Sequence, residues 1–287
     1  MSIELSVIIP AYNESARLSA TLAQVCAYLH AQPYDAELIV VDDGSDDDTA
    51  HIAAQSFARC AGRIAAHLIR VHPNRGKGFA VRQGLLAARA PIALFSDADL
   101  STPITEAPKL VEPLRSGQYD VVFGSRALNR RLIGVHQPWR REQGGRLFNL
   151  VVRVATGMPY WDTQCGFKAF RLDICRPLVE AAQIDRFGFD VELLYMAQVG
   201  GLRLLEWPVR WDHNEGSKVN VVRDSLRMLD EVRRVRGLRR AGAYDEVLAR
   251  AQEVAARPEA RAPLKPREAN SPHTDFPLKM VRAAGRM

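Results

Sequence analysis

The stretch PIALFSDADLSTP, residues 91–103, decides the fold. Its first part, Pro91–Ser96, is almost entirely apolar and has the length of a buried strand, and the chain then turns polar with Asp97 and Asp99. Strands that are apolar on both faces belong to parallel sheets covered by helices. Such sheets bind ligands at the carboxyl ends of their strands. The stretch therefore predicts a covered parallel sheet with two carboxylates at its ligand-binding edge.

Short apolar runs alternate with helical patterns through the first 125 residues. The predicted fold class is therefore α/β, with a mostly parallel sheet flanked by helices. Every polar motif in this part follows a predicted strand. The predicted strands are Leu5–Ile9, Glu37–Val41, Ala66–Val71, Pro91–Ser96 and Asp120–Gly124. The predicted helices are Glu14–Leu29, Asp46–Cys60, Gly78–Arg89 and Ile104–Arg115.

The second half of the chain is less regular. Residues 126–137 are predicted to form a mobile loop, and Pro208 indicates an edge or a break in the strand Leu202–Trp211. We expect one domain over residues 1–250, in two halves (1–125 and 126–250), and a disordered basic Ala/Arg/Pro-rich tail over 251–287. The other predicted elements are the helices Glu142–Thr156, Phe189–Val199 and Val219–Arg236 and the strand Phe167–Phe170.

Composition and charge narrow the class of protein. The 287 residues are 47% hydrophobic and 25% charged, as in ordinary globular proteins. No apolar run approaches the ~18 residues of a spanning helix, and the N-terminal run is too short for a signal peptide. We therefore expect a cytoplasmic protein without a transmembrane segment. The net charge of +6 suits an anionic membrane or a phosphorylated substrate. Nucleic acid is excluded as a partner, because no nucleic-acid-binding motif is present.

The chain has four cysteines without CxxC or zinc-site spacing. They predict four reduced thiols, three of them filling the core. The cysteines are Cys26, Cys60, Cys165 and Cys175.

Asp97 and Asp99 predict a metal site. Two carboxylates this close repel each other unless a cation or a proton lies between them. Mg²⁺ or Mn²⁺ would relieve that repulsion and could also bind a diphosphate. The alternative is a polar turn in which Ser101 or Thr102 caps the next helix.

Three other loops offer polar groups. Tyr12 has a flat ring for a base, and Asp43 can accept hydrogen bonds from a base or a ribose. The alternative is that the loops after the first two strands merely cap helices. In HPNRGKG, residues 72–78, Arg75 and Lys77 predict an anion site at a helix N-terminus, although the spacing is not that of a Walker A loop. A flexible basic turn is the competing interpretation.

In their order and spacing these motifs resemble the family-2 glycosyltransferases of the GT-A fold. The similarity covers about residues 3–236 and is strongest to enzymes that glycosylate polyprenyl phosphates: dolichol-phosphate mannose synthases and, more closely, dolichyl-phosphate β-glucosyltransferases. The motifs are PAYNE (10–14), DDGS (42–45), NRGKG (74–78), DADLSTP (97–103), GSR (124–126), DTQCGFK (162–168), FDVELL (189–194) and EGSK (215–218).

The resemblance implies a nucleotide-sugar half, 1–125, and an acceptor half, 126–250. It also implies site residues. The nucleoside would be held by Pro10, Tyr12, Glu14, Val41 and Asp43, the donor and metal by Asp97, Ala98 and Asp99, and the phosphates by Arg126 and Lys218. From the same motifs we add to the donor-binding set Ala11, Asp42, Lys77 and Gln164. Arg141 matches an arginine that receives the acceptor phosphate. Ser101 departs from the mannose synthases, which usually have a metal-binding Gln there, and His213 and Asn214 replace an Arg of those enzymes.

The resemblance implies an inverting transfer of a hexose to a polyprenyl phosphate. UDP-glucose is the first choice of donor, ahead of GDP-mannose and UDP-GlcNAc. A lipid phosphate is already anionic, so the acceptor needs no general base. The catalytic set would be Asp97, Asp99, Arg126, Arg141 and Lys218. Without a spanning segment, the chain would reach lipid through a peripheral contact with the cytoplasmic face of an anionic membrane or through a membrane partner protein.

Two alternatives stay open. A family-2 transferase acting on a sugar hydroxyl would need a base, and Asp162, Asp190 and Glu192 are the candidates. A non-catalytic sugar-nucleotide binding module is the other, although the intact Asp97 and Asp99 argue against it. Nucleotidyl transfer is disfavoured, because no Gly-rich, Arg-containing loop follows the first strand.

Overall fold

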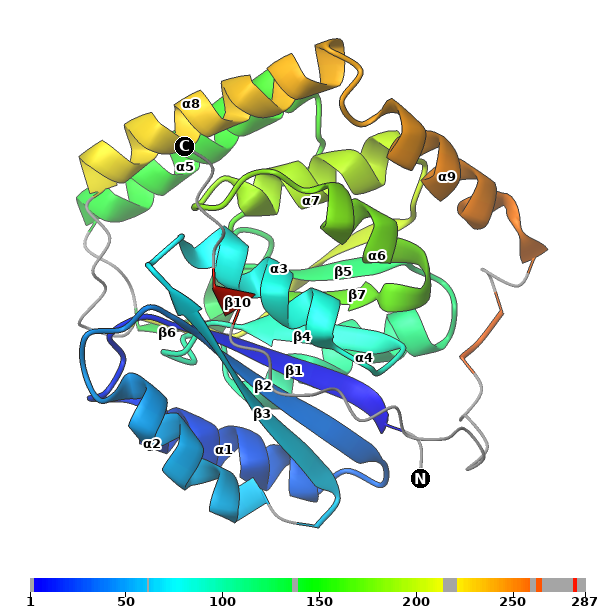
Figure 1. Ribbon diagram of the computed structural model, residues 1–287. Helices are drawn as coiled ribbons and strands as arrows, with labels where there is room; N and C mark the ends of the chain where they lie inside the picture. Colours follow the sequence, from blue (N-terminus) through cyan, green and yellow to red (C-terminus); the bar gives the residue numbers. More distant parts are fainter. Residues whose placement is uncertain are drawn as a thin grey trace.

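The computed structural model describes residues 3–60, 62–135, 139–213, 221–258, 262–264 and 281–282. Its centre is a sheet with the strand order β10-β3-β2-β1-β4-β7-β5-β8 (Figure 1). The neighbouring pairs are parallel except that β7 runs antiparallel to both β4 and β5. The strands are β1 (Ile3–Ala11), β2 (Asp35–Asp43), β3 (Ile64–His72), β4 (Ile92–Ser96), β5 (Val121–Ser125), β7 (Phe167–Arg171), β8 (Leu204–Pro208) and β10 (Val281–Arg282).

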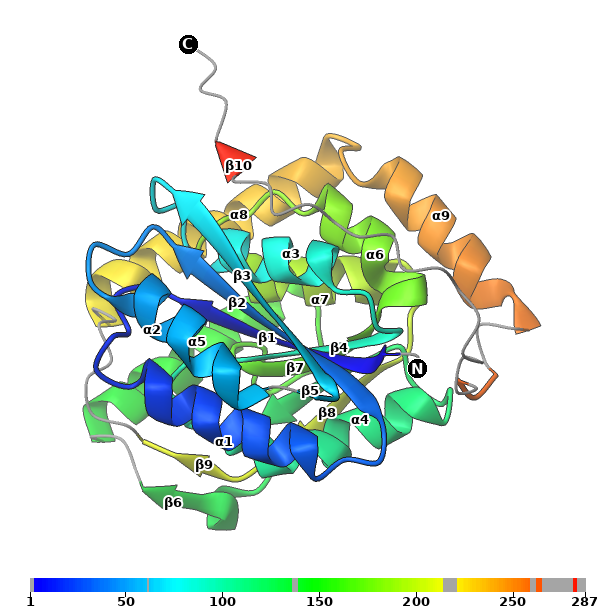
Figure 2. The same ribbon diagram turned by 60° about the horizontal axis from the view of Figure 1, so that its bottom comes forward.

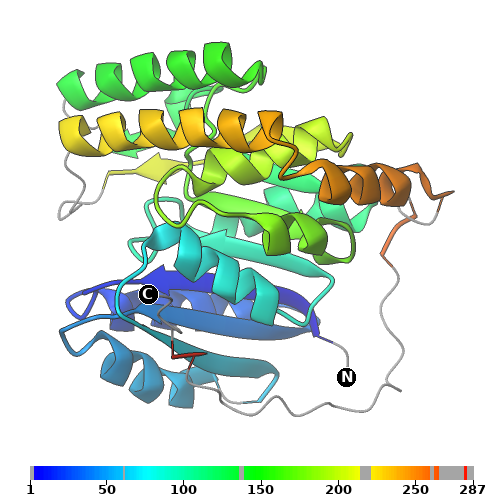
Figure 3. The same cartoon turned by 45° about the horizontal axis from the view of Figure 1, so that its top comes forward.

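Helices cover both faces of the sheet, as the apolar strands require (Figures 1 and 2). One apolar core unites the sheet with α1 and α4, and the other unites it with α3, α6 and α7. Helices α5 and α8 lie side by side in an outer layer, far from α1 and α2 (Figures 1 and 3). The helices are α1 (Leu18–His30), α2 (Thr49–Ser56), α3 (Lys77–Ala87), α4 (Ala107–Arg115), α5 (Trp139–Thr156), α6 (Leu172–Ala181), α7 (Phe189–Val199), α8 (Val221–Arg240) and α9 (Asp245–Ala256).

The structure confirms the predicted fold class. The predicted strands and helices of the first 125 residues all occur, with ends that differ by a few residues. The predicted helix from Asp46 to Cys60 is α2 followed by the short 3₁₀ helix η1 (Phe57–Cys60). Pro208 ends β8, which is an edge strand, as its missing N–H group favours.

Two expectations are corrected, and one helix was not expected. Part of the predicted mobile loop, residues 126–137, contains the 3₁₀ helix η3 (Arg130–Leu132) and strand β6 (Ile133–Val135). Strand β6 pairs with β9 (Trp211–Asp212), a partner too distant in sequence for local periodicity to reveal. Helix α6 was not predicted. Helix α9 crosses the boundary placed at 250, because Tyr244 and Leu248 are buried against α6 and α7.

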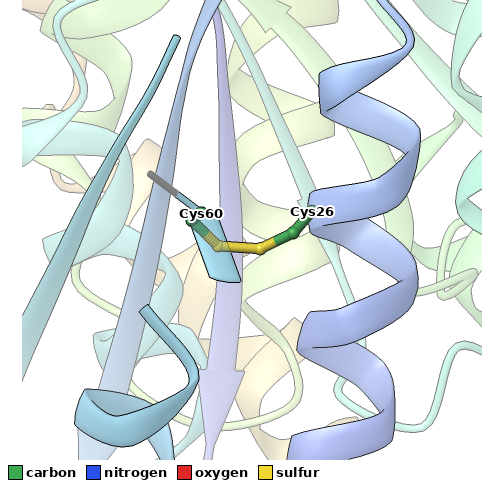
Figure 4. Close-up of a disulfide and its surroundings, with 2 residues drawn as sticks. All are labelled: Cys26 and Cys60. Atoms are coloured by element: carbon green, nitrogen blue, oxygen red, sulfur yellow. A yellow bond between two sulfur atoms is a disulfide. The ribbon is translucent and has the colours of Figure 1, made fainter. Parts of the chain in front are cut away.

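The cysteines also differ from the prediction of four reduced thiols. Cys26 on α1 and Cys60 on η1 form a disulfide, with their Cα atoms 5.5 Å apart (Figure 4). Cys165 and Cys175 are free and buried. The two paired residues are 34 positions apart and meet only because α1 and η1 pack together, so spacing alone could not pair them.

None of the helices in the described part of the chain combines the length and the apolar composition that crossing a bilayer requires.

Candidate active site

The loops that follow β1 and β2 form one unit. In the parallel pairing of these strands Pro10 lies opposite Val41, so the loops leave the sheet side by side. The Asn13 N–H donates to Ser45 Oγ at 2.9 Å, and the Glu14 N–H donates to Thr49 Oγ1 at 2.7 Å. The residue before α1, Arg17, makes no side-chain cap. In the loop after β2, however, Asp47 Oδ1 accepts the N–H of Thr49, the first residue of α2, at 3.0 Å, so helix capping accounts for part of that loop. The two loops also hydrogen-bond to each other.

Asp43 fixes the loop that precedes α3. Its carboxylate accepts the Arg75 N–H at 3.0 Å, the Gly76 N–H at 2.7 Å and the Asn74 side-chain amide at 2.9 Å. Burial raises the pKa of Asp43 above its ordinary value, although these backbone donors oppose the shift. Gly76 has a φ of +116°, a conformation that favours glycine. Asp43 thereby sets the direction in which α3, and its first residue Lys77, begins.

Lys77 reaches the end of β4. Its ammonium lies 2.5 Å from Asp97 Oδ1, and the side chains of Lys77 and Asp97 are 22% and 35% exposed. The opposite side of this carboxylate is closed by Gly166: a Cβ on that glycine would lie 2.0 Å from Asp97 Oδ2. The Asp97 N–H also donates to the Gly166 carbonyl at 3.1 Å. Asp97 thus lies between the Lys77 ammonium and the backbone of Gly166, a position where a residue with a Cβ would clash with the carboxylate.

Asp99 lies in the turn after Asp97 and shares its surroundings. Its Oδ1 accepts the Ser101 N–H at 2.9 Å. Burial lowers the pKa of the Lys77 ammonium, but the carboxylates of Asp97, Asp190 and Asp99 raise it above its ordinary value. Both predicted metal ligands therefore act on the same cation. The next helical segment, the 3₁₀ helix η2 (Ile104–Glu106), has no side-chain cap, so the capping alternative for Ser101 or Thr102 is wrong.

The donor atoms at this strand end fit a divalent cation. They are carboxylate oxygens, and Asp97 is accessible from solvent. Groups of three or more metal-binding side chains are absent from the described residues. Two carboxylates suffice where a substrate diphosphate and water complete the coordination.

A buried ion pair lies behind Lys77. The Lys168 ammonium is 2.7 Å from Asp190 Oδ1, with both side chains at most 5% exposed. Burial raises the pKa of Asp190 above its ordinary value, although Lys168 and Lys77 both lower it. The site therefore contains two lysines, Lys77 and Lys168, and three carboxylates, those of Asp97, Asp99 and Asp190, whose charges act on one another.

Arg126, after β5, is held by Asp162. Its guanidinium Nε and Nη2 each lie 2.7 Å from an oxygen of that carboxylate, and its backbone N–H donates to the same group. Burial lowers the pKa of Arg126, but the Asp162 carboxylate outweighs this effect and raises the pKa above its ordinary value. Burial likewise raises the pKa of Asp162, but the Arg126 guanidinium outweighs it and lowers that pKa below its ordinary value. Glu206 supports the pair by accepting the Asp162 N–H at 2.8 Å. This arrangement presents a permanent cation near the strand ends.

Comparison with known proteins names the class to which this site belongs. A family model described as Glycosyl transferase family 2 matches residues 6–176. The chain belongs to this family. A dolichyl-phosphate beta-glucosyltransferase of Drosophila melanogaster is 37% identical to this glycosyltransferase. The alignment covers 76% of the present chain and 70% of the Drosophila protein. The human protein of that name is 33% identical over 75% and 69%. Glycosyltransferase AglD of Haloferax volcanii is 35% identical, but the alignment spans only 37% of that protein.

Solved structures support the GT-A fold of this glycosyltransferase. Glucosyl-3-phosphoglycerate synthase of Mycobacterium tuberculosis, in complex with phosphoglyceric acid, aligns with a TM-score of 0.61 and 21% identity, covering 82% of this chain and 80% of the other. The same enzyme in complex with Mn²⁺, UDP-glucose and phosphoglyceric acid aligns with a TM-score of 0.60 and 22% identity.

The structure brings most of the predicted site residues of this glycosyltransferase to one edge of the sheet. Tyr12 is 40% exposed there, whereas Ala11, Val41, Asp42 and Ala98 are buried. Glu14 pairs with Arg17 at 2.7 Å. Gln164 is drawn toward α8, where its amide lies 2.9 Å from Met228 Sδ. Lys218 lies outside the described residues, as does the side chain of Arg141 on α5.

Sequence reasoning missed the supporting contacts of this glycosyltransferase. The motifs DTQCGFK and FDVELL were expected to supply Gln164 and three candidate bases, but the packing of Gly166 on Asp97 and the pairing of Lys168 with Asp190 were not predicted. A lysine in a strand that is otherwise apolar was the available signal, because a buried ammonium requires a carboxylate partner. From the sequence, Asp162 was expected only as a candidate base, and its ion pair with Arg126 was not predicted.

Proposed function

We propose that this glycosyltransferase moves glucose from UDP-glucose to the phosphate of a polyprenyl lipid, with inversion at the anomeric carbon. The named activity of the eukaryotic relatives supports this choice. The observation that carries it is the state of the carboxylates that could have served as a base. In the described residues, all three candidates are committed to structural partners.

Each of these three carboxylates contacts a protein group that holds it in place. Asp162 binds Arg126 through both oxygens. Asp190 is buried against Lys168. Glu192 is fully buried and accepts hydrogen bonds from the Gln183 and Ile184 backbone and from the Tyr244 hydroxyl. A sugar hydroxyl needs a base, whereas a lipid phosphate is already anionic. The arrangement therefore favours a phosphate acceptor.

The chain's own residues would prepare the donor. Tyr12 and the loop fixed by Asp43 would hold the nucleoside, and Asp97 and Asp99 would hold Mg²⁺ or Mn²⁺ with the diphosphate. When bound, the cation would stabilise the negative charge that develops on the leaving β-phosphate. Arg126 would contribute a second, preoriented positive charge, because Asp162 fixes its guanidinium. Arg141 and Lys218 complete the proposed phosphate contacts.

A peripheral contact with an anionic membrane would give access to the lipid. The outer layer formed by α5 and α8 carries exposed aliphatic side chains, with Leu150 53% and Val154 79% exposed. Arg153 on the same helix lies over the Trp161 ring, 3.9 Å from its centroid. Exposed arginines follow on α8, at positions 233, 234, 236 and 240. Exposed apolar groups on α5 and exposed basic groups on the adjacent α8 would suit a bilayer with anionic headgroups.

The test is product formation from radiolabelled UDP-glucose and Mn²⁺ with either a polyprenyl phosphate or the matching polyprenyl alcohol. We expect a glucolipid only from the phosphate, and loss of turnover in Asp97→Asn. Transfer to the alcohol or to a glucan, with Asp190→Asn abolishing turnover but not donor binding, would instead identify a hydroxyl acceptor. Binding of UDP-glucose without release of UDP under any condition would identify a non-catalytic module.

A further inference from the structure

The Lys77 ammonium lies against the carboxylate of Asp97, a predicted metal ligand. It lies 2.5 Å from Asp97 Oδ1, while Gly166 closes the other side of the same carboxylate. A divalent cation bound to Asp97 would lie within a few ångströms of this ammonium. Two cations at that distance repel each other, most strongly where little water screens them. Lys77 and a metal therefore compete for one carboxylate.

Lys77 has a second carboxylate close by. Asp190 acts on the Lys77 ammonium and is itself anchored by the buried Lys168, 2.7 Å away. Because Lys77 is the first residue of α3 and its long side chain is 22% exposed, its ammonium can move without any change in the helix. A diphosphate arriving with the metal would offer further anionic partners. The displaced ammonium would thus keep a favourable environment.

We propose that Lys77 is an exchangeable counter-ion: it holds Asp97 before the donor binds and is displaced when the metal and the nucleotide bind together. This inference rests on the proposed metal-dependent function. It makes metal and nucleotide binding depend on each other, because metal alone must displace Lys77 without compensation. Without nucleotide the enzyme would bind divalent cations weakly, and the donor would enter together with its metal.

The test is Mn²⁺ binding, measured by the electron paramagnetic resonance signal of free Mn²⁺, with and without saturating UDP. In the absence of UDP, we expect Lys77→Met to bind Mn²⁺ on the order of tenfold more tightly than the unmodified protein. With UDP the difference should shrink or reverse, because Lys77 then assists the diphosphate. Asp97→Asn in the Lys77→Met background should remove the gain.

Lys109→Met is the matched control. Lys109 pairs with Glu106 at 2.6 Å, so this substitution removes the same charge without freeing Asp97. It should leave Mn²⁺ affinity unchanged. Lys77→Gln provides a second neutral variant, and circular dichroism checks that each variant is folded.

The outcomes separate the inference from the function on which it rests. If the unmodified protein binds Mn²⁺ only with UDP, but the neutral Lys77 variants bind it no more tightly without UDP, the exchange is wrong and the metal-dependent function stands. If no variant binds Mn²⁺ even with UDP, the metal-dependent function itself is wrong.

Discussion

At the scale of single residues, the position of one carboxylate depends on a missing side chain. Gly166 leaves no room for a Cβ, which would lie 2.0 Å from Asp97 Oδ2. Any larger residue must push the carboxylate away from its present position, and the Lys77 contact of 2.5 Å would be lost. A displacement of about 1 Å at a reacting centre costs on the order of 10²-fold in rate.

Gly166→Ala should therefore lower kcat about a hundredfold. Protein stability should change little, since Asp97 is partly exposed and can swing toward solvent. Gly237→Ala on α8 is the control, because nothing lies within 4 Å of its added Cβ. Steady-state kinetics and thermal unfolding of both variants measure the effect. Unchanged activity in Gly166→Ala would mean that the position of Asp97 does not matter.

The sequence predicted the residues of this candidate site but not the contacts among them. Asp97, Asp99 and Lys77 could be selected because each follows a strand or begins a helix. The partner of Lys77 could not be selected, since several acidic side chains occur at neighbouring strand ends and local spacing does not rank them. Close approaches such as that of Gly166 to Asp97 depend on how β4 and β7 pair.

At the scale of elements, a single carboxylate ties three strands and a helix end together. Glu37 on β2 accepts from Ser6 Oγ on β1 at 2.7 Å and from Arg89 Nε, after α3, at 2.7 Å. His67 Nε2 on β3 lies 3.3 Å away. Burial raises the pKa of Glu37, but hydrogen bonds from His67, Ser6 and Arg89 outweigh it and bring the pKa to about 2.

Glu37 should make the stability of the fold depend on pH. Because its folded pKa is depressed, its contribution is complete above about pH 4.5 and is lost as pH falls toward 2. Glu37→Gln should lower the free energy of unfolding at pH 7 by about 2–3 kcal/mol. In urea unfolding at a series of pH values, the difference between the two proteins should shrink below pH 4.5. Glu112→Gln, at an exposed surface pair, should cost less than about 1 kcal/mol at every pH.

The elements that the sequence predicted are those with a strong local pattern. Apolar strands and periodic helices of the first half were recognised because burial on both faces leaves a readable composition. Strand β6 was missed since its pairing with β9 is long-range and both strands are short. The domain boundary was expected at 250 because the composition turns to Ala, Arg and Pro there, but Leu248 and Ala251 of α9 are buried in the core and the Tyr244 hydroxyl donates to Glu192 at 2.6 Å.

At the scale of the whole molecule, the layer of α5 and α8 separates two kinds of apolar residue. Phe148 and Val152 on α5 are buried in the core, whereas Leu150, Val151 and Val154 are exposed. The sequence could not show which of these side chains face the core, because the apolar residues between 148 and 154 would have the same pattern whether they packed on the core or on a bilayer. The structure leaves the second group uncovered on a layer that also carries exposed arginines.

If this layer contacts lipid, Val154→Asp should weaken binding to anionic vesicles. Removing a valine from an apolar contact costs about 1.5 kcal/mol, or roughly tenfold in affinity, and the added charge costs more. Ala54→Asp is the matched control: it adds the same charge at an exposed position on α2, at the far end of the molecule (Figure 1). Vesicle flotation with phosphatidylserine-containing and purely zwitterionic lipids measures both. Equal flotation of the two variants would exclude α5 from the contact, and membrane access would then have to come from another surface or from a partner protein.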